Sequence, residues 1–239
     1  MIAFVVATLS IYGFWVVTHW FIPNKIYWRQ VIFAAWTRSF VKISGMKIEV
    51  HGTAPKPPFF LVANHLSYAD IAALRQVATG VFVAKAEISK WPVAGAIIRN
   101  MGTVFIDRSN RRDIPRAGEI ILERLDAGEG VMVFPEGTST KGEEVLPFNS
   151  SFLQFAAERD LPVHYASITY STPPGEMEAN LAVCWWEEIG FFPHIFRLFR
   201  TPSYTATIYF GEAPIANANR KELARDLRDR VEEMFEPVV

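Results

Sequence analysis

Apolar and polar residues alternate along the chain in a pattern that changes near residue 45. Residues 1–22 contain no charged side chain, and residues 25–44 mix aromatic residues with lysine and arginine. As a helix, the first segment would measure about 33 Å, enough for the hydrocarbon core of a bilayer. The pair Pro23-Asn24 separates the two segments. The pattern therefore predicts two helices over residues 1–44.

Beyond residue 45, short apolar runs indicate strands. These runs cover residues 47–50, 59–63, 81–85, 104–106, 131–134, 163–169, 181–185 and 205–210. Helical patterns cover residues 69–78, 114–126 and 220–235. Alternating strands and helices favour an α/β layer fold. We predict a layered mixed sheet flanked by helices over residues 45–239, preceded by a two-helix, membrane-embedded motif over residues 1–44.

The charge distribution supports a membrane location for the first segment. Residues 1–48 carry five Lys or Arg and no acid, although the whole chain has a formal net charge of −1. Basic residues beside an apolar segment suit anionic lipids, and their aromatic neighbours argue against a nucleic-acid groove. We expect membrane lipids as partners, no nucleic acid, and a catalytic part that faces the cytoplasm from the inner membrane. Whether residues 1–22 span the membrane or embed in one leaflet stays open.

The sharpest chemical signal is Asn64-His65, followed by Asp70. The group follows an apolar run at residues 59–63 and opens a helical pattern. Loops at strand ends place reactive groups, and an aspartate about one and a half helical turns later can fold back on the imidazole. Asp70 would then hold one nitrogen of His65 while the other takes a proton from a substrate hydroxyl. A structural histidine with a capping aspartate is the alternative.

Two further blocks follow predicted strands. Arg108 comes after the run at residues 104–106, and its guanidinium fits a phosphate. The sequence Phe-Pro-Glu-Gly-Thr occupies residues 134–138, where Gly137 lets a ligand approach the backbone and exposed amides suit an anion. Taken singly, a solvated charge cluster and an ordinary turn explain these blocks as well.

Together, the three blocks resemble those of the glycerolipid acyltransferases, in particular the bacterial 1-acylglycerol-3-phosphate acyltransferases, over about residues 45–170. Their order and spacing agree with the family, as does the pair Trp91-Pro92. The resemblance implies that His65 is the general base and Asp70 its partner. It also implies a set of substrate-binding residues, namely Asn64, Lys85, Arg108, Glu136, Gly137 and Thr138.

The resemblance further implies a reaction. A fatty acyl group would pass from acyl-CoA or acyl-carrier-protein to the free hydroxyl of lysophosphatidic acid, giving phosphatidic acid for phospholipid biosynthesis. Since a thioester is already activated, a base, an oriented hydroxyl and oxyanion stabilisation suffice. We expect no cofactor besides the donor substrate and no metal, because the single cysteine, Cys184, and the histidines show no metal-ligand spacing.

Two departures from the family pattern leave the acceptor open. Ser139 and Thr140 stand between the third block and Lys141, where a basic residue often follows directly, and Tyr165 replaces the second proline of a fourth block. Acylation of another lysolipid, such as a lyso-aminolipid, is therefore an alternative. A non-catalytic lipid-binding membrane protein is an alternative of another class, and a thioester hydrolase is a third.

Residues 191–200 form an unusual stretch, in which six large apolar side chains surround two arginines without an acid. Such a mixture is typical of a lipid interface. The core packing of a short helix explains it equally well.

Overall fold

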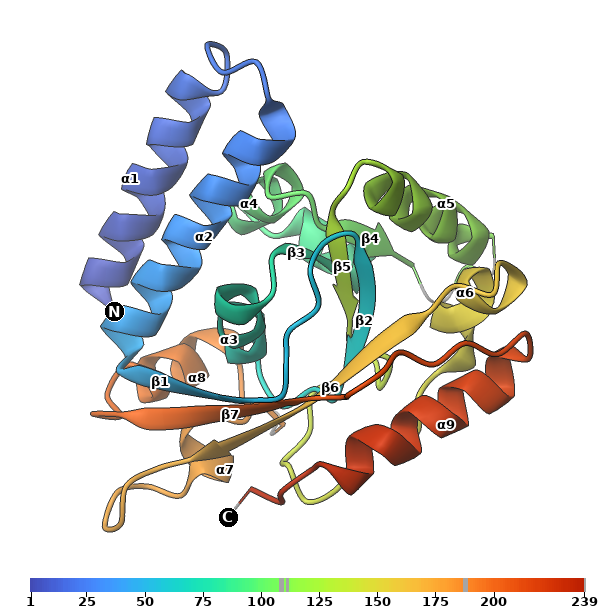
Figure 1. Ribbon diagram of the computed structural model, residues 1–239. Helices are drawn as coiled ribbons and strands as arrows, with labels where there is room; N and C mark the ends of the chain where they lie inside the picture. Colours follow the sequence, from blue (N-terminus) through green and yellow to red (C-terminus); the bar gives the residue numbers. More distant parts are fainter. Residues whose placement is uncertain (108–109, 111, 187–188, 239) are drawn as a thin grey trace.

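Figure 1 shows the computed structural model of the protein, which describes residues 1–107, 110, 112–186 and 189–238. Within this part of the chain, seven strands form one sheet in the order β1-β7-β6-β2-β5-β3-β4. β6 and β7 pair antiparallel, and all other neighbouring strands pair parallel. The predicted mixed sheet flanked by helices is confirmed.

The bounds of the elements agree with most of the apolar runs. The strands are β1 (Met46–His51), β2 (Phe59–Ala63), β3 (Gly80–Lys85), β4 (Val104–Ile106), β5 (Gly130–Val133), β6 (Val163–Ser171) and β7 (Tyr204–Phe210). The helices are α1 (Ile2–Thr18), α2 (Lys25–Ser44), α3 (Ala69–Val77), α4 (Ala94–Asn100), α5 (Asp113–Asp126), α6 (Gln154–Glu158), α7 (Ala179–Ala182), α8 (Phe191–Leu198) and α9 (Arg220–Glu233), with short 3-10 helices η1 (Ala86–Lys90) and η2 (Ser150–Leu153). The strand predicted at residues 181–185 is wrong, because this run forms the end of α7 and an irregular segment after it.

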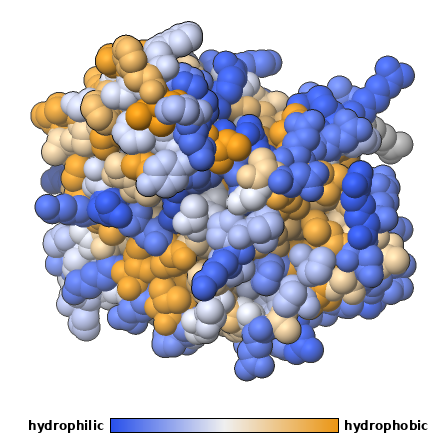
Figure 2. Space-filling view, turned by 45° about the horizontal axis from the view of Figure 1, so that its top comes forward, coloured by the Kyte–Doolittle hydropathy of each residue, from blue (hydrophilic) through white to orange (hydrophobic). Residues whose placement is uncertain are grey.

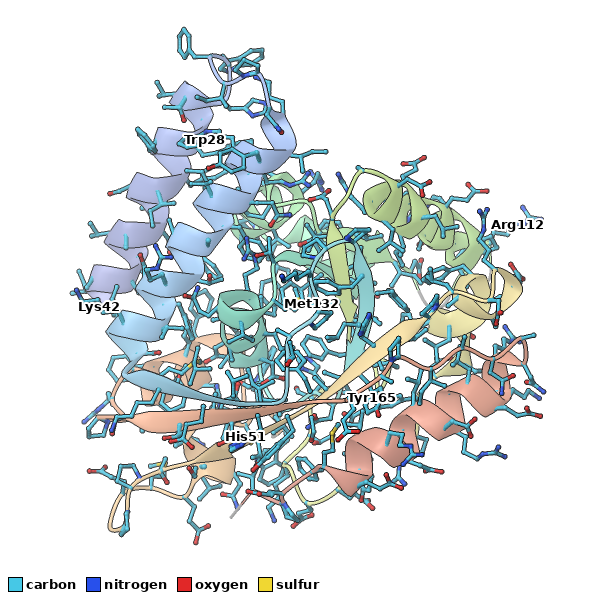
Figure 3. The ribbon with its side chains drawn as sticks, in the orientation of Figure 1. Trp28, Lys42, His51, Arg112, Met132 and Tyr165 are labelled. Carbon is cyan, nitrogen blue, oxygen red and sulfur yellow. The ribbon has the colours of Figure 1, made fainter. Side chains whose placement is uncertain are left out.

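Two hydrophobic cores lie on opposite faces of the sheet, because successive side chains of a strand point to opposite sides. Leu61 and Ala63 of β2 join the core beneath α1, α2 and α3. Phe60 and Val62 join the core beneath α5, α6 and α9. Figure 3 labels Met132 of β5, which belongs to the first core. Helices therefore cover both faces of the central strands, which explains their continuous apolar sequences.

The helices α1 and α2 form an antiparallel hairpin at the left of Figure 1. Asn24 caps α2 by accepting the N–H of Tyr27, and Gly45 ends the helix with a φ of 74°. Trp28 lies between the two helices in Figure 3, where its indole N–H donates to Thr18 at 3.0 Å. α1 ends at Thr18, earlier than the apolar segment of the sequence does. Among the described residues, no helix has the length and apolar character needed to cross a membrane.

The parallel strands place the chemical motifs at one edge of the sheet. β2 and β5 are parallel neighbours, and Asn64-His65 follows β2 while Phe134 to Thr138 follow β5. Open α/β sheets bind ligands at the carboxyl ends of their strands. Two of the three sequence blocks therefore meet where such a fold forms its sites.

Candidate active site

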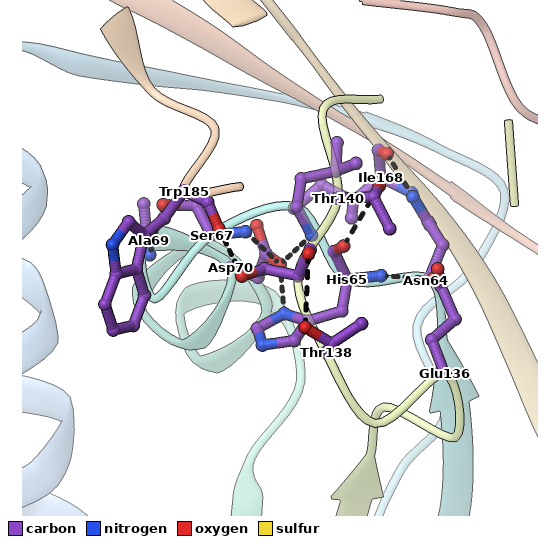
Figure 4. A network of polar contacts seen from close by, with 12 residues as sticks. Asn64, His65, Ser67, Ala69, Asp70, Glu136, Thr138, Thr140, Ile168 and Trp185 are labelled. Atoms are coloured by element: carbon purple, nitrogen blue, oxygen red, sulfur yellow. Dashed lines mark hydrogen bonds and ion pairs between the residues drawn. The ribbon is translucent and has the colours of Figure 1, made fainter. Parts of the chain in front are cut away.

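The candidate active site centres on the contact between His65 and Asp70 (Figure 4). Asp70 lies in the first turn of α3, and its Oδ2 is 2.7 Å from Nδ1 of His65. Because a carboxylate only accepts hydrogen bonds, we assign the ring hydrogen to Nδ1, which makes Nε2 the basic nitrogen of the neutral ring. The contact that the spacing predicts is confirmed. The catalytic role of the two residues stays a prediction.

Four donors surround the fully buried carboxylate of Asp70. Besides the His65 ring, Oδ2 accepts the backbone N–H of Leu66 at 2.8 Å and that of Ser67 at 3.0 Å. Oδ1 accepts the hydroxyl of Tyr170, a buried residue of β6, at 2.7 Å. Burial raises the pKa of Tyr170, and the charge of Asp70 raises it further, so the hydroxyl keeps its proton. These bonds fix the carboxylate against the imidazole.

His65 is held through both its ring and its backbone. The ring stacks on Phe134, with centroids 4.2 Å apart and planes 10° apart, and its side chain is 21% exposed. Its backbone N–H donates to Oε1 of Glu136 at 2.7 Å. Its carbonyl accepts the N–H of Thr140 at 3.0 Å. The loop after β5 therefore fixes the histidine from two sides.

Glu136 lies behind His65 rather than beside its ring. Its second carboxyl oxygen accepts the backbone N–H of Leu146 at 3.2 Å. Burial raises the pKa of Glu136 to about 8, and the charge of Asp70 adds to the rise, while the two backbone hydrogen bonds oppose it. Both oxygens are thus directed at backbone amides. Its contact with the acceptor, which the resemblance implies, stays a prediction.

Asn64 extends the pairing of β2 with β6 by one residue. Its Nδ2 donates to the carbonyl of Ile168 at 2.9 Å, and its Oδ1 accepts the N–H of Ile168 at 2.7 Å. The side chain is buried. Because both ends of the amide bind backbone, this placement anchors the loop that carries His65. The substrate contact predicted for Asn64 gains no support from it.

The binding roles expected for Lys85, Arg108, Gly137 and Thr138 stay predictions. Lys85 ends β3 with an exposed side chain. Gly137 has a φ of 79°, which favours glycine, and Thr138 beside it is exposed. Arg108 lies outside the described residues. Within the described residues, no group of three or more His, Cys, Asp or Glu side chains is placed to hold a metal ion.

The departure at Tyr165 lies on the far face of the sheet. Tyr165 pairs in register with Val62 and packs on the core beneath α9, with its ring over Gly211. Figure 3 labels it on β6. His65 stacks on Phe134, which belongs to the opposite core. Tyr165 and the ring of His65 therefore lie on opposite faces of the sheet.

The departure near Lys141 lies on the loop that holds His65. The hydroxyl of Ser139 donates to the carbonyl of Trp185. Nζ of Lys141 is 2.6 Å from Glu143 and 5.5 Å from the ring centroid of Trp186. Both side chains of this ion pair are exposed, so the pair holds Lys141 only weakly.

Three residues support the pair of His65 and Asp70 but have no role assigned from the sequence, namely Phe134, Thr140 and Tyr170. Phe134 belongs to the third block and Thr140 follows it, so the position of that block could have indicated both residues. Tyr170 stands 100 positions after Asp70. Only the strand order, with β6 beside β2, links them.

Comparisons with known proteins agree with this geometry. Residues 47–169 match the protein family described as Acyltransferase. The chain is 33% identical over 215 residues to the lyso-ornithine lipid O-acyltransferase of Rhizobium meliloti (strain 1021). The aligned region covers 84% of this chain and 73% of that protein. It is 32% identical over 194 residues to the 1-acyl-sn-glycerol-3-phosphate acyltransferase of Neisseria gonorrhoeae. This aligned region covers 80% of this chain and 74% of that protein.

The fold is also similar to a solved structure. The crystal structure of the 1-acyl-sn-glycerophosphate acyltransferase of Thermotoga maritima matches with a TM-score of 0.57 over 98% of this chain and 96% of that chain, at 24% identity. The family match covers His65, Asp70 and Glu136. This chain therefore belongs to the acyltransferase family and is an enzyme of the 1-acylglycerol-3-phosphate acyltransferase type.

Proposed function

We propose that the protein transfers a fatty acyl group from a thioester donor, acyl-CoA or acyl-carrier-protein, to the free hydroxyl of a lysolipid. The observation that carries the proposal is the 2.7 Å contact between His65 and Asp70, which leaves Nε2 of the ring free to accept a proton. The names of the relatives, which act on lysolipids, support the acceptor class. The family assignment favours this enzyme over a non-catalytic lipid-binding protein.

The proposed reaction begins when Nε2 of His65 accepts the proton of the lysolipid hydroxyl. The hydroxyl oxygen attacks the thioester carbonyl carbon, and a C–O bond forms. The C–S bond then breaks, the thiolate leaves, and the proton on Nε2 passes to the sulfur. Asp70 stabilises the imidazolium while it carries that proton. The net change is one ester formed, one thioester broken and one thiol released.

We propose lysophosphatidic acid as the acceptor that the three blocks favour, with phosphatidic acid as the product. A lyso-ornithine lipid is the second candidate. The Rhizobium meliloti relative supports it, because that protein is named a lyso-ornithine lipid O-acyltransferase.

The test is a panel of lysolipids with oleoyl-CoA, in which thiol release and product lipid are followed together. We expect product from lysophosphatidic acid and a fall of about 10²–10⁴-fold in the His65→Ala variant, because a general base contributes that much. Product from lyso-ornithine lipid alone would keep the mechanism and change the acceptor. Thioester cleavage that needs no lysolipid would indicate a hydrolase. Silence with both oleoyl-CoA and acyl-carrier-protein donors would refute the proposal.

We further propose that the α1–α2 hairpin embeds in the cytoplasmic leaflet of the inner membrane. Its exposed apolar residues support this: Val6, Leu9, Phe14, Val17, Trp20 and Phe21 of α1 and the turn after it. Figure 2 shows apolar side chains gathered over these helices at the upper left of the view. Protease access to an N-terminal tag tests the proposal, since embedding in one leaflet predicts no cleavage from the opposite face of the membrane.

A further inference from the structure

The helix α8 has one buried face and one exposed face. His194, Ile195 and Leu198 are buried, whereas Phe192 is 77% exposed and Phe196 is 46% exposed. Residues four apart lie on the same side of a helix, so the two exposed phenylalanines form one apolar strip. Single exposed apolar side chains need no explanation, but adjacent ones mark a surface that interacts with an apolar partner.

The buried face of α8 is tied to the loop that carries the catalytic pair. Nε2 of His194 lies 2.9 Å from the carbonyl of Cys184, and Nδ1 lies 2.9 Å from the hydroxyl of Tyr68. A carbonyl only accepts, so Nε2 carries the hydrogen and Tyr68 donates to Nδ1. Tyr68 stands two residues before Asp70 in the chain. The position of α8 is thus coupled to the start of α3.

Aromatic contacts strengthen this coupling. The ring of Phe191 lies 5.2 Å from that of Tyr68 and 5.9 Å from that of Trp185. The backbone N–H of Trp185 donates to the carbonyl of Leu66, the residue after His65, at 2.8 Å. The exposed strip of α8 is therefore one layer of side chains away from the active-site loop.

The charge around α8 fits an anionic surface. Residues 189–211 contain two arginines and no acid. Arg197 donates to the carbonyl of Leu181 at 3.0 Å, so the exposed Arg200 is the cation that this surface offers. The guanidinium of Arg200 lies 5.5 Å from the ring centroid of Phe196. An aromatic ring with an arginine head at its rim is typical of the interface between lipid head groups and acyl chains.

The apolar strip also continues onto neighbouring elements. On one side, Phe199 after α8 packs on Phe4 of α1 with ring centroids 5.2 Å apart. On the other side, Phe191 packs on Trp91 at 5.5 Å, and Val93 close to Trp91 is strongly exposed. Three segments far apart in the sequence therefore bring apolar side chains to one region. This region adjoins α1, the helix proposed above to embed in a leaflet.

We propose that α8 forms a second membrane-contact surface, in which Phe192 and Phe196 enter the head-group region of an anionic bilayer beside the active site. The proposal rests on the proposed acyl transfer between amphiphiles, whose substrates lie in that same region. Contact at α8 would hold the loop of His65 and Asp70 at the bilayer, so that a lysolipid hydroxyl reaches His65 without leaving the interface.

The first experiment locates Phe192 directly. The single native cysteine, Cys184, is buried, so a thiol-reactive environment-sensitive fluorophore labels Phe192→Cys selectively. Vesicles of phosphatidylcholine and phosphatidylglycerol should shift its emission to the blue and allow quenching by spin-labelled lipid. Val50→Cys on the edge strand β1, which is 43% exposed, is the matched control and should not respond. No response at position 192 while the protein sediments with the vesicles would overturn the proposal.

The second experiment separates membrane contact from chemistry. Phe192→Ser/Phe196→Ser should lower the rate on lysolipid in anionic vesicles by about tenfold, because the two phenyl rings that would enter the bilayer are lost. The rate on a short-chain lysolipid below its micelle concentration should stay within about twofold, as no interface is involved. Equal rates of variant and native protein on vesicles would contradict the proposal. If the native protein transfers no acyl group to either acceptor, the proposed function fails, and the fluorescence still tests the surface.

Discussion

At the scale of single residues, the donors to Asp70 decide how strongly it holds a protonated His65. Tyr170→Phe removes the hydroxyl that donates to Oδ1 at 2.7 Å. A less compensated carboxylate favours the imidazolium form of His65. We expect the acid limb of the plot of kcat against pH to move to higher pH, and kcat near neutral pH to fall about tenfold. Steady-state kinetics across pH checks this.

Tyr204→Phe is the matched control for that prediction. Tyr204 is also buried and its ring lies 6.0 Å from that of Tyr170, but its hydroxyl donates to Ser44 at 3.0 Å. Both variants should lose a similar amount of stability, about 1 kcal/mol. Only Tyr170→Phe should move the acid limb. Matching pH profiles in the two variants would show that Tyr170 is merely structural.

Glu136 makes the stability of the fold depend on pH. Its pKa of about 8 lies above the ordinary value of 4.5, so the native state binds this proton more tightly than the unfolded chain does. The stabilisation that protonated Glu136 gives to the fold is fully present below the ordinary pKa, and it is lost as pH rises through the raised pKa.

Glu136→Gln removes this titration. It also lowers the free energy of unfolding by an amount that does not depend on pH, because the NH₂ group of glutamine would face a backbone N–H that a carboxyl oxygen accepts in the native protein. We therefore expect the free energy of unfolding of the native protein to exceed that of the variant by more at about pH 5 than at about pH 9. Urea unfolding in detergent at both pH values measures it. A difference that is the same at both would mean that Glu136 titrates normally in the fold.

The sequence predicted the residues that carry chemistry better than the residues that support them. The spacing of His65 and Asp70 sufficed because their contact is local, between residues five apart in the chain. The hydrogen bonds of Asn64 with Ile168 and of Glu136 with the backbone of His65 join distant parts of the chain, so they could be predicted only from the strand order. A motif shows that a residue matters, but not whether its side chain meets the substrate or the backbone.

At the scale of elements, Asn64 tests how the end of β2 is fixed to β6. Asn64→Asp keeps the size of the side chain but turns an oxygen toward the carbonyl of Ile168, where Nδ2 donates in the native protein. Two buried acceptors would then face each other, and we expect a loss of about 2–3 kcal/mol in the free energy of unfolding. Thermal unfolding measures the change.

Asn219→Asp is the comparison at an exposed site. Asn219 caps α9 by accepting the N–H groups of Lys221 and Glu222. Aspartate caps a helix about as well as asparagine. It loses the exposed bond from Nδ2 of Asn219 to Glu222, so this variant should lose less than about 1 kcal/mol. Equal losses in the two variants would show that the amide of Asn64 does not anchor β2 to β6.

The elements that the sequence predicted correctly are those with a strong local signal. α2 begins and ends where its pattern does, because Asn24 and Gly45 cap it. α7 was mistaken for a strand because a short apolar run has the same appearance in a buried helix and in a buried strand. α1 ends at Thr18 although the apolar residues continue, since hydropathy alone carries no stop signal for a helix.

At the scale of the whole molecule, a buried polar cluster joins the hairpin to the sheet. The carboxylate of Glu129, just before β5, binds Arg29 and, at 2.6 Å, Gln30, both on α2. It also lies 3.4 Å from Arg124 of α5. Gln30 in turn accepts from Arg75 of α3 at 2.8 Å. One carboxylate therefore links a helix of the proposed membrane motif to α5 and to the strand that leads to the active-site loop.

Removing that carboxylate should loosen the hairpin from the sheet. Glu129→Ala leaves the largely buried Arg29 without its anion, and breaking such a pair by losing one partner costs about 3–5 kcal/mol. We expect a lower midpoint of thermal unfolding and faster proteolysis within residues 19–24, the turn between α1 and α2. Glu123→Ala on the exposed side of α5 is the control and should change neither. If Glu129→Ala unfolded at a lower temperature with unchanged proteolysis of the turn, the hairpin would be held by its aromatic packing on the sheet, and the cluster would stabilise only the base of β5.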